Sequence, residues 1–133
     1  MGKLIVRRIY AVWNWLIAAA VVAQVFLAGL YVFGVTSIEA HAINGSFLLL
    51  ATLLGAVFAL AARVPGRVAG SSWALFGLVV LQVALIEVGN STGIPLIKAF
   101  HVVNALAIFG VSALLASWSR AFFAAPKRAD ARA

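Results

Sequence analysis

Residues 40–62 read AHAINGSFLLLATLLGAVFALAA, without one Asp, Glu, Lys or Arg. A helix needs about 20 such residues to cross the hydrocarbon core of a bilayer. Three more stretches lack these charged residues, namely 9–38, 68–86 and 99–119. Backbone polar groups in lipid must be hydrogen-bonded within their own segment, which favours helices. The sequence therefore predicts an all-α membrane protein with four transmembrane helices.

Breaks between these stretches set the expected helix boundaries. Pro65 and Gly66 interrupt the middle of the chain, and the run from Gly89 to Pro95 is rich in turn residues. We expect one transmembrane domain over residues 1–125, followed by a charged, disordered tail over 126–133. The helices are expected at about 10–34, 40–62, 71–89 and 97–120.

Charge is sparse and unevenly placed. Of 133 residues, 65% are hydrophobic and 10% are charged, which excludes an ordinary soluble globular domain. The net charge of +7 would suggest a nucleic-acid partner in a soluble protein, but its distribution fits the positive-inside rule and no nucleic acid is expected. Only Lys98 falls on the opposite side from the other nine cations. We therefore expect a multi-pass protein of the inner (cytoplasmic) membrane with both termini cytoplasmic and the bilayer as its main partner.

Rare polar residues recur along the chain and indicate an internal repeat. Two pairs match at an offset of 58 and two at an offset of 60, and they are Trp15 with Trp73, Gln24 with Gln82, His41 with His101, and Asn44 with Asn104. The repeat predicts two helical hairpins of the same orientation, which would form a four-helix bundle.

The two histidines of this repeat are the strongest candidates for chemistry. His41 and His101 are the chain's only histidines, and both are expected near the outer ends of the second and fourth helices. Neutral imidazole ligates haem iron, and a helix N-terminus disfavours imidazolium. Two histidines are too few for a zinc site, and the absence of cysteine excludes thiolate ligands. We expect them to be axial ligands of one haem b, the alternative being two interfacial histidines without a ligand.

Other polar or small residues near the histidines have two interpretations each. Asn44, Asn104 and Gly45 would border the cofactor, or would serve helix packing and interhelical hydrogen bonds. Lys98 would pair with a haem propionate, or would extend to the interface as an ordinary lysine. Glu39 and Glu87 are candidates for a proton or quinone site, or are solvated acids.

Two resemblances follow from these residues. The run Gln24-Val-Phe-Leu-Ala-Gly-Leu30, His41 and His101-Val-Val-Asn-Ala105 resemble an uncharacterised family of small four-helix bacterial membrane proteins. The layout also resembles one four-helix half of haem A synthase, in which the second and fourth helices each carry a histidine near the outer face. This resemblance implies bis-histidine haem binding. Glu39 lies closer to His41 than the corresponding synthase glutamate does, and only one half is present, so the oxygenating reaction is not implied.

The predicted function is electron transfer by a small b-type cytochrome-like protein that is part of a larger complex, rather than a stand-alone enzyme. The expected partners are other membrane or outer-face redox subunits, a quinone, or a second copy of the chain. Two alternatives remain, a cofactor-free accessory subunit of a membrane complex and a small carrier or lipid-binding protein.

Overall fold

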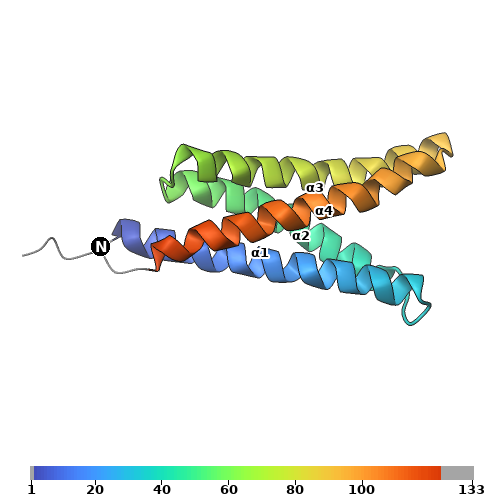
Figure 1. Ribbon diagram of the computed structural model, residues 1–133, viewed down its shortest axis with the longest axis horizontal. Coiled ribbons are helices and arrows are strands. Elements are labelled where there is room, and N and C mark those ends of the chain that lie inside the picture. The colour runs from blue at the N-terminus through green and yellow to red at the C-terminus, as the bar shows by residue number, and fades with distance from the viewer. Residues whose placement is uncertain (1, 124–133) are drawn as a thin grey trace, which may run out of the picture.

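Four long helices joined by short connections make up residues 2–123, the part of the chain that the computed structural model describes (Figure 1). The helices are α1 (Gly2–Val32), α2 (Glu39–Ala61), α3 (Gly66–Thr92) and α4 (Pro95–Ser119), and a short 3₁₀ helix, η1 (Arg120–Phe122), follows α4. All four long helices are long and apolar enough to cross a membrane. The predicted all-α four-helix membrane bundle is therefore confirmed, while the tail predicted at 126–133 lies outside the described residues.

The helix ends extend beyond several predicted boundaries. Helix α1 begins at Gly2 rather than near residue 10, because Lys3 and Arg7 end the apolar run without ending the helix. Arg7 donates hydrogen bonds to the carbonyl oxygens of Ala62 (3.3 Å) and Arg63 (3.0 Å), which lie at the end of α2. A cation at this place offsets the negative end of the helix dipole. Arg7 thus contributes to the fold by joining α1 to the end of α2.

The connection between α3 and α4 is much shorter than the predicted loop at 89–95. Helix α3 continues to Thr92, and the hydroxyls of Ser91 and Thr92 bond back to the carbonyl of Val88. Gly93 then adopts a left-handed conformation with φ of 69°, and Pro95 opens α4. Glycine commonly follows the C-terminus of a helix, and proline is common at the first position of the next one. The two hairpins therefore differ, since a longer connection (33–38) joins α1 to α2.

The helices pack in cyclic order, so that α1 contacts α2 and α4, and α3 also contacts α2 and α4. Helices α2 and α4 consequently lie diagonally across the bundle. Small side chains line the core of α2, where Ala51, Gly55, Ala56 and Ala59 are buried. Large apolar side chains such as Phe26, Val102 and Leu106 are more than 60% exposed, as expected for residues facing lipid.

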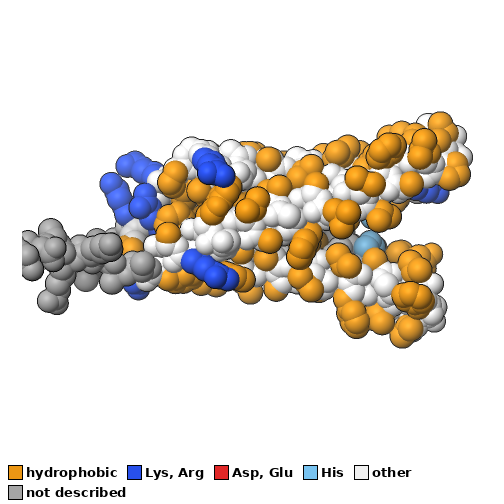
Figure 2. All heavy atoms as spheres, viewed as in Figure 1, with side chains coloured by type: hydrophobic (Ala, Val, Ile, Leu, Met, Phe, Trp, Pro, Cys, Tyr) orange, Lys and Arg blue, Asp and Glu red, His pale blue; other side chains and the backbone are white. Residues whose placement is uncertain are grey.

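The two ends of the bundle differ in closure. At the end that carries Arg7, Arg63 and Arg120, here called the arginine end, the helices are packed together. Toward the end that carries His41 and His101, here called the histidine end, the α1–α2 and α3–α4 hairpins spread apart (Figure 1). Figure 2 shows the resulting notch between two apolar lobes, with a histidine side chain at its base. The bundle is therefore open where the repeated histidines lie.

Candidate functional site

His41 and His101 face each other from diagonal helices. His41 is the third residue of α2 and His101 the seventh of α4, and their ring centroids are 6.4 Å apart with an interplanar angle of 53°. Both side chains are partly buried. The predicted juxtaposition of the two histidines across the bundle is therefore present.

Within the first hairpin, His41 belongs to a hydrogen-bond network between α1 and α2. Its Nδ1 lies 3.2 Å from the backbone carbonyl oxygen of Gln24, and the Gln24 amide donates to the backbone carbonyl of His41 at 3.0 Å. Asn44 donates to the Gln24 side-chain oxygen (2.6 Å) and to the carbonyl of Ala20 (3.0 Å). The two amides and the imidazole thus tie α2 to α1.

The second hairpin repeats this network residue for residue. His101 Nδ1 lies 3.1 Å from the Gln82 carbonyl oxygen, and the Gln82 amide donates to the His101 carbonyl at 2.9 Å. Asn104 donates to the Gln82 side chain (2.6 Å) and to the carbonyl of Leu78 (2.8 Å). The offsets of 58 and 60 therefore describe equivalent positions in space as well as in sequence.

These bonds assign the proton of each imidazole. A backbone carbonyl can only accept a hydrogen bond, so Nδ1 must be the protonated nitrogen in both rings. Each neutral ring then presents an unprotonated Nε2. Histidines that ligate metals commonly donate their other ring N–H to a carbonyl in this way, which fixes the tautomer and the ring orientation.

The two networks differ at one bond. The Gln24 amide nitrogen also lies 3.2 Å from His41 Nε2, whereas no corresponding bond from Gln82 to His101 Nε2 occurs within residues 2–123. Gly45 lies next to this contact, because a Cβ at position 45 would be 3.1 Å from the Gln24 amide nitrogen. Position 45 is thus a place where α2 approaches the glutamine of α1 closely.

The remaining candidates lie around this pair without contacting it through a hydrogen bond in the described residues. The stem of Lys98 lies against Gly89 of α3, where an added Cβ would be 2.6 Å from Lys98 Cγ. Glu39 and Glu87 are exposed at the histidine end, on α2 and α3. All three belong to the histidine end of their helices, but within residues 2–123 neither glutamate forms a metal-binding group with the imidazoles. Gly55, part of the small-residue stripe on α2, instead packs against Trp13 and Ile17 of α1.

The sequence interpretation missed a second polar cluster, at the arginine end. Tyr10 donates to Ser72 Oγ at 2.7 Å, since the Ser72 hydroxyl is itself donated to the Val68 carbonyl. Asn14 donates to Ser119 Oγ at 3.3 Å. These four side chains are buried and connect α1 to α3 and α4. A signal was present, because Asn14 and Ser72 are related by the same offset of 58 as the two glutamines.

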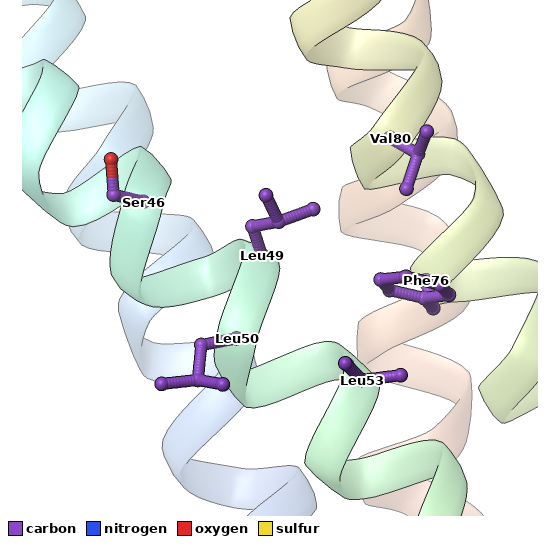
Figure 3. Close-up of a pocket in the computed structure, with 6 residues that line it drawn as sticks. All are labelled: Ser46, Leu49, Leu50, Leu53, Phe76 and Val80. Carbon is purple, nitrogen blue, oxygen red and sulfur yellow. The ribbon is translucent and has the colours of Figure 1, made fainter.

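A surface groove lies between α2 and α3 and is not part of the histidine site. It has a volume of about 340 Å³, and Figure 3 shows Leu49 and Leu53 of α2 across from Phe76 of α3. Ser46, Leu50 and Val80 complete its lining. With one hydroxyl, already bonded to the Ala42 carbonyl, this groove offers apolar contact and no ligating atom.

The histidine site fits a bis-histidine haem in its donor chemistry. Two imidazoles that share one metal ion have ring centroids about 6 Å apart, since each metal–nitrogen bond is about 2 Å. The observed 6.4 Å is close to this value, and the notch separates the two hairpins at the same place. His41 Nε2, however, lies 3.2 Å from the Gln24 amide nitrogen and would have to leave it to reach a shared iron. Within residues 2–123, no group of three or more His, Cys, Asp and Glu side chains could hold a metal ion by itself. A porphyrin, which brings four nitrogens of its own, needs only these two ligands.

Comparison with known proteins places the chain in a family but brings no activity. A family model described as a family of unknown function (DUF6220) matches residues 24–90, so the chain belongs to this family. The match covers Gln24, His41, Asn44 and Gln82 and ends before His101. No curated protein and no solved structure matches the chain.

Proposed function

We propose that this member of the DUF6220 family is a small b-type cytochrome that binds one haem at its histidine end. His41 and His101 would be the axial ligands, from α2 and α4. The observation that carries the proposal is the pair of imidazoles 6.4 Å apart, each with Nδ1 bonded to a backbone carbonyl. Each imidazole is held by its own hydrogen-bond network. The two networks match each other in a chain that is otherwise poor in polar residues.

Each residue of the two networks has a defined task in this proposal. The carbonyls of Gln24 and Gln82 hold the Nδ1 protons and so leave Nε2 of each ring as the nitrogen that would bind iron, once the Gln24 amide has released His41 Nε2. Asn44 and Asn104 fix the glutamine side chains and thereby the spacing of the paired helices. Lys98 is the one cation at this end of the described bundle and would pair with a propionate.

A bound haem would supply reversible one-electron transfer. With both imidazoles bound, oxygen could reach the iron only by displacing one of them, which disfavours oxygen chemistry. The connections at the histidine end, residues 33–38 and 93–94, are too short to form a catalytic domain. We therefore propose an electron-transfer subunit that works with a membrane or outer-face redox partner. For a quinol donor, Glu39 and Glu87 are the exposed carboxylates that would receive protons.

The proposed orientation places the histidine end on the outer face of an inner membrane. Arg7, Arg63, Arg67 and Arg120 gather at the opposite end, as cytoplasmic residues do under the positive-inside rule. Reporter fusions would test this orientation, with cytoplasmic signal expected at the N-terminus and periplasmic signal at the 33–38 connection. The reverse result would place the site on the cytoplasmic face.

A cofactor-free accessory subunit is the second candidate, and one observation favours it. The Gln24 amide already forms a hydrogen bond with His41 Nε2. Every buried polar side-chain atom within residues 2–123 has a hydrogen-bond partner. The networks would then serve only to join helices, as polar side chains do in membrane bundles.

Haem stoichiometry separates the two candidates. The protein would be produced with an ample haem supply, purified in mild detergent, and assayed for haem by extraction and for protein by amino-acid analysis. We expect about one haem per chain in the native protein, a ratio that follows from two ligands shared by one iron. A haem-free, folded protein would support the accessory subunit and exclude the cytochrome.

A further inference from the structure

The two halves of the site are not equivalent, and the difference lies in a single bond. In the first hairpin the Gln24 amide uses one N–H on the His41 carbonyl and directs the other toward His41 Nε2, at 3.0 and 3.2 Å. In the second hairpin the Gln82 amide bonds to the His101 carbonyl at 2.9 Å, and His101 Nε2 has no hydrogen-bond partner within the described residues. The lone pair that a metal would use is therefore occupied in His41 and free in His101.

The sequence contains a matching difference one helical turn further along each helix. Position 45 is glycine, and the Gln24 amide nitrogen lies where a Cβ at this position would be only 3.1 Å away. The equivalent position in the second half, at the offset of 60, is Ala105, which has a Cβ. Glycine at position 45 thus leaves the space in which the Gln24 amide lies beside His41.

From this asymmetry we propose that Gln24 is a positioning residue that masks His41 Nε2. His101 would be the permanent axial ligand and His41 the exchangeable one, so that a small neutral ligand such as imidazole could enter on the His41 side. The inference rests on the proposed haem site for its consequence, but the masking itself is a property of the haem-free chain. A ligand nitrogen that must first release an amide N–H binds iron more weakly by the free energy of that hydrogen bond.

A pair of matched variants isolates the masking bond. Gln24→Met and Gln82→Met remove the same interhelical bonds in the two hairpins, to the histidine carbonyl and to the asparagine side chain. Only Gln24→Met also releases an imidazole nitrogen. Any general loosening of a hairpin should therefore appear in both variants, and unmasking should appear in one.

Acylation of the haem-free protein by diethyl pyrocarbonate measures the masking directly, because an unprotonated ring nitrogen attacks a carbonyl carbon of the reagent and ethyl carbonate leaves. Mass spectrometry of peptides would give separate rates for His41 and His101 in one sample. We expect His101 to react about two- to tenfold faster in the native protein, the factor that a hydrogen bond of ordinary strength implies. Gln24→Met should bring the two rates together, and Gln82→Met should leave the ratio unchanged. Equal rates in the native protein, or equal effects of the two variants, would overturn the inference.

Haem titration of the same proteins tests the consequence for the site. Gln24→Met should lower the Kd for haem by about two- to tenfold and should abolish binding of added imidazole, whereas Gln82→Met should not tighten haem binding. Masking in the acylation assay together with no haem binding by any protein would exclude the proposed function and leave the Gln24–His41 bond established. Haem binding with no difference between the halves would instead exclude the masking role and retain the cytochrome.

Discussion

The imidazole rings of His41 and His101 lie 6.4 Å apart although their helices, α2 and α4, are diagonal in the bundle and do not pack on each other. Diagonal helices approach each other only through their side chains. The two rings therefore define a distance across the centre of the bundle, at the end where the hairpins spread apart (Figure 1). Each ring is held by its own hairpin, so the distance between them depends on how the two hairpins are joined.

Asn104 is expected to stabilise the α3–α4 hairpin through its two hydrogen bonds, to the Gln82 side chain and the Leu78 carbonyl. Asn104→Leu should lower the free energy of unfolding in detergent by about 1 kcal/mol, the usual size of such bonds in membrane bundles. Ser46→Ala is the control, because the Ser46 hydroxyl is exposed and bonds only within its own helix. Equal stability of the two variants would show that the Asn104 network is not a structural element.

Tyr10 is expected to join the two hairpins at the arginine end, through its bond to Ser72 of α3. Tyr10→Phe removes only the hydroxyl and should cost about 0.5–1.5 kcal/mol of unfolding free energy in a chemical denaturation series. Tyr31→Phe, at a residue 47% exposed, should be neutral. Unchanged stability of Tyr10→Phe would show that this buried cluster does not hold the two hairpins together at the arginine end.

Gly55 is expected to set the distance between α1 and α2. A Cβ there would be 3.2 Å from Ile17 and 3.3 Å from Trp13, so Gly55→Leu should overpack the hairpin and destabilise it by about 1–3 kcal/mol. Gly77→Leu is a matched control, since nothing lies within 4 Å of a Cβ at position 77. Thermal unfolding of both variants would check this, and a similar loss at both positions would mean that helix flexibility rather than packing is affected.

Lys98 is expected to contribute to haem affinity by charge alone. Lys98→Met should raise the Kd for haem about two- to fivefold, as an exposed ion pair would, and added salt should reduce the difference. Lys3→Met removes a cation at the opposite end and should have no effect. An unchanged Kd for Lys98→Met at low salt would assign the propionates to other contacts.

Much of the site was predictable because polar residues are so rare in this chain. The matched spacing of His41 and His101 predicted that they share a depth, and the structure brings them together. The sequence could not predict that each glutamine bonds within its own hairpin, because that depends on the rotation of α1 about its axis relative to α2. The same holds for the Gln24–His41 bond, which depends on the close approach at Gly45.

Helix ends were the least predictable part of the fold. Apolar runs mark the hydrocarbon thickness, but α1 continues through Arg7 because the arginine side chain finds carbonyls at the end of α2. Arg63 adopts a left-handed conformation with φ of 49° at the end of α2, a position where glycine is usual. The Tyr10–Ser72 bond was also not predicted, because it joins the diagonal helices α1 and α3, and no local sequence pattern indicates such a contact.

The central claim, that His41 and His101 share one haem iron, is tested most directly by the reduced-minus-oxidised absorption spectrum of the purified protein. The native chain should show the sharp bands of a low-spin b-type haem, and both His41→Ala and His101→Ala should lose them while remaining folded. Gly77→Leu, at a position where an added Cβ would have nothing within 4 Å, should keep the native spectrum. A colourless native protein, or low-spin bands that survive in either histidine variant, would contradict the claim.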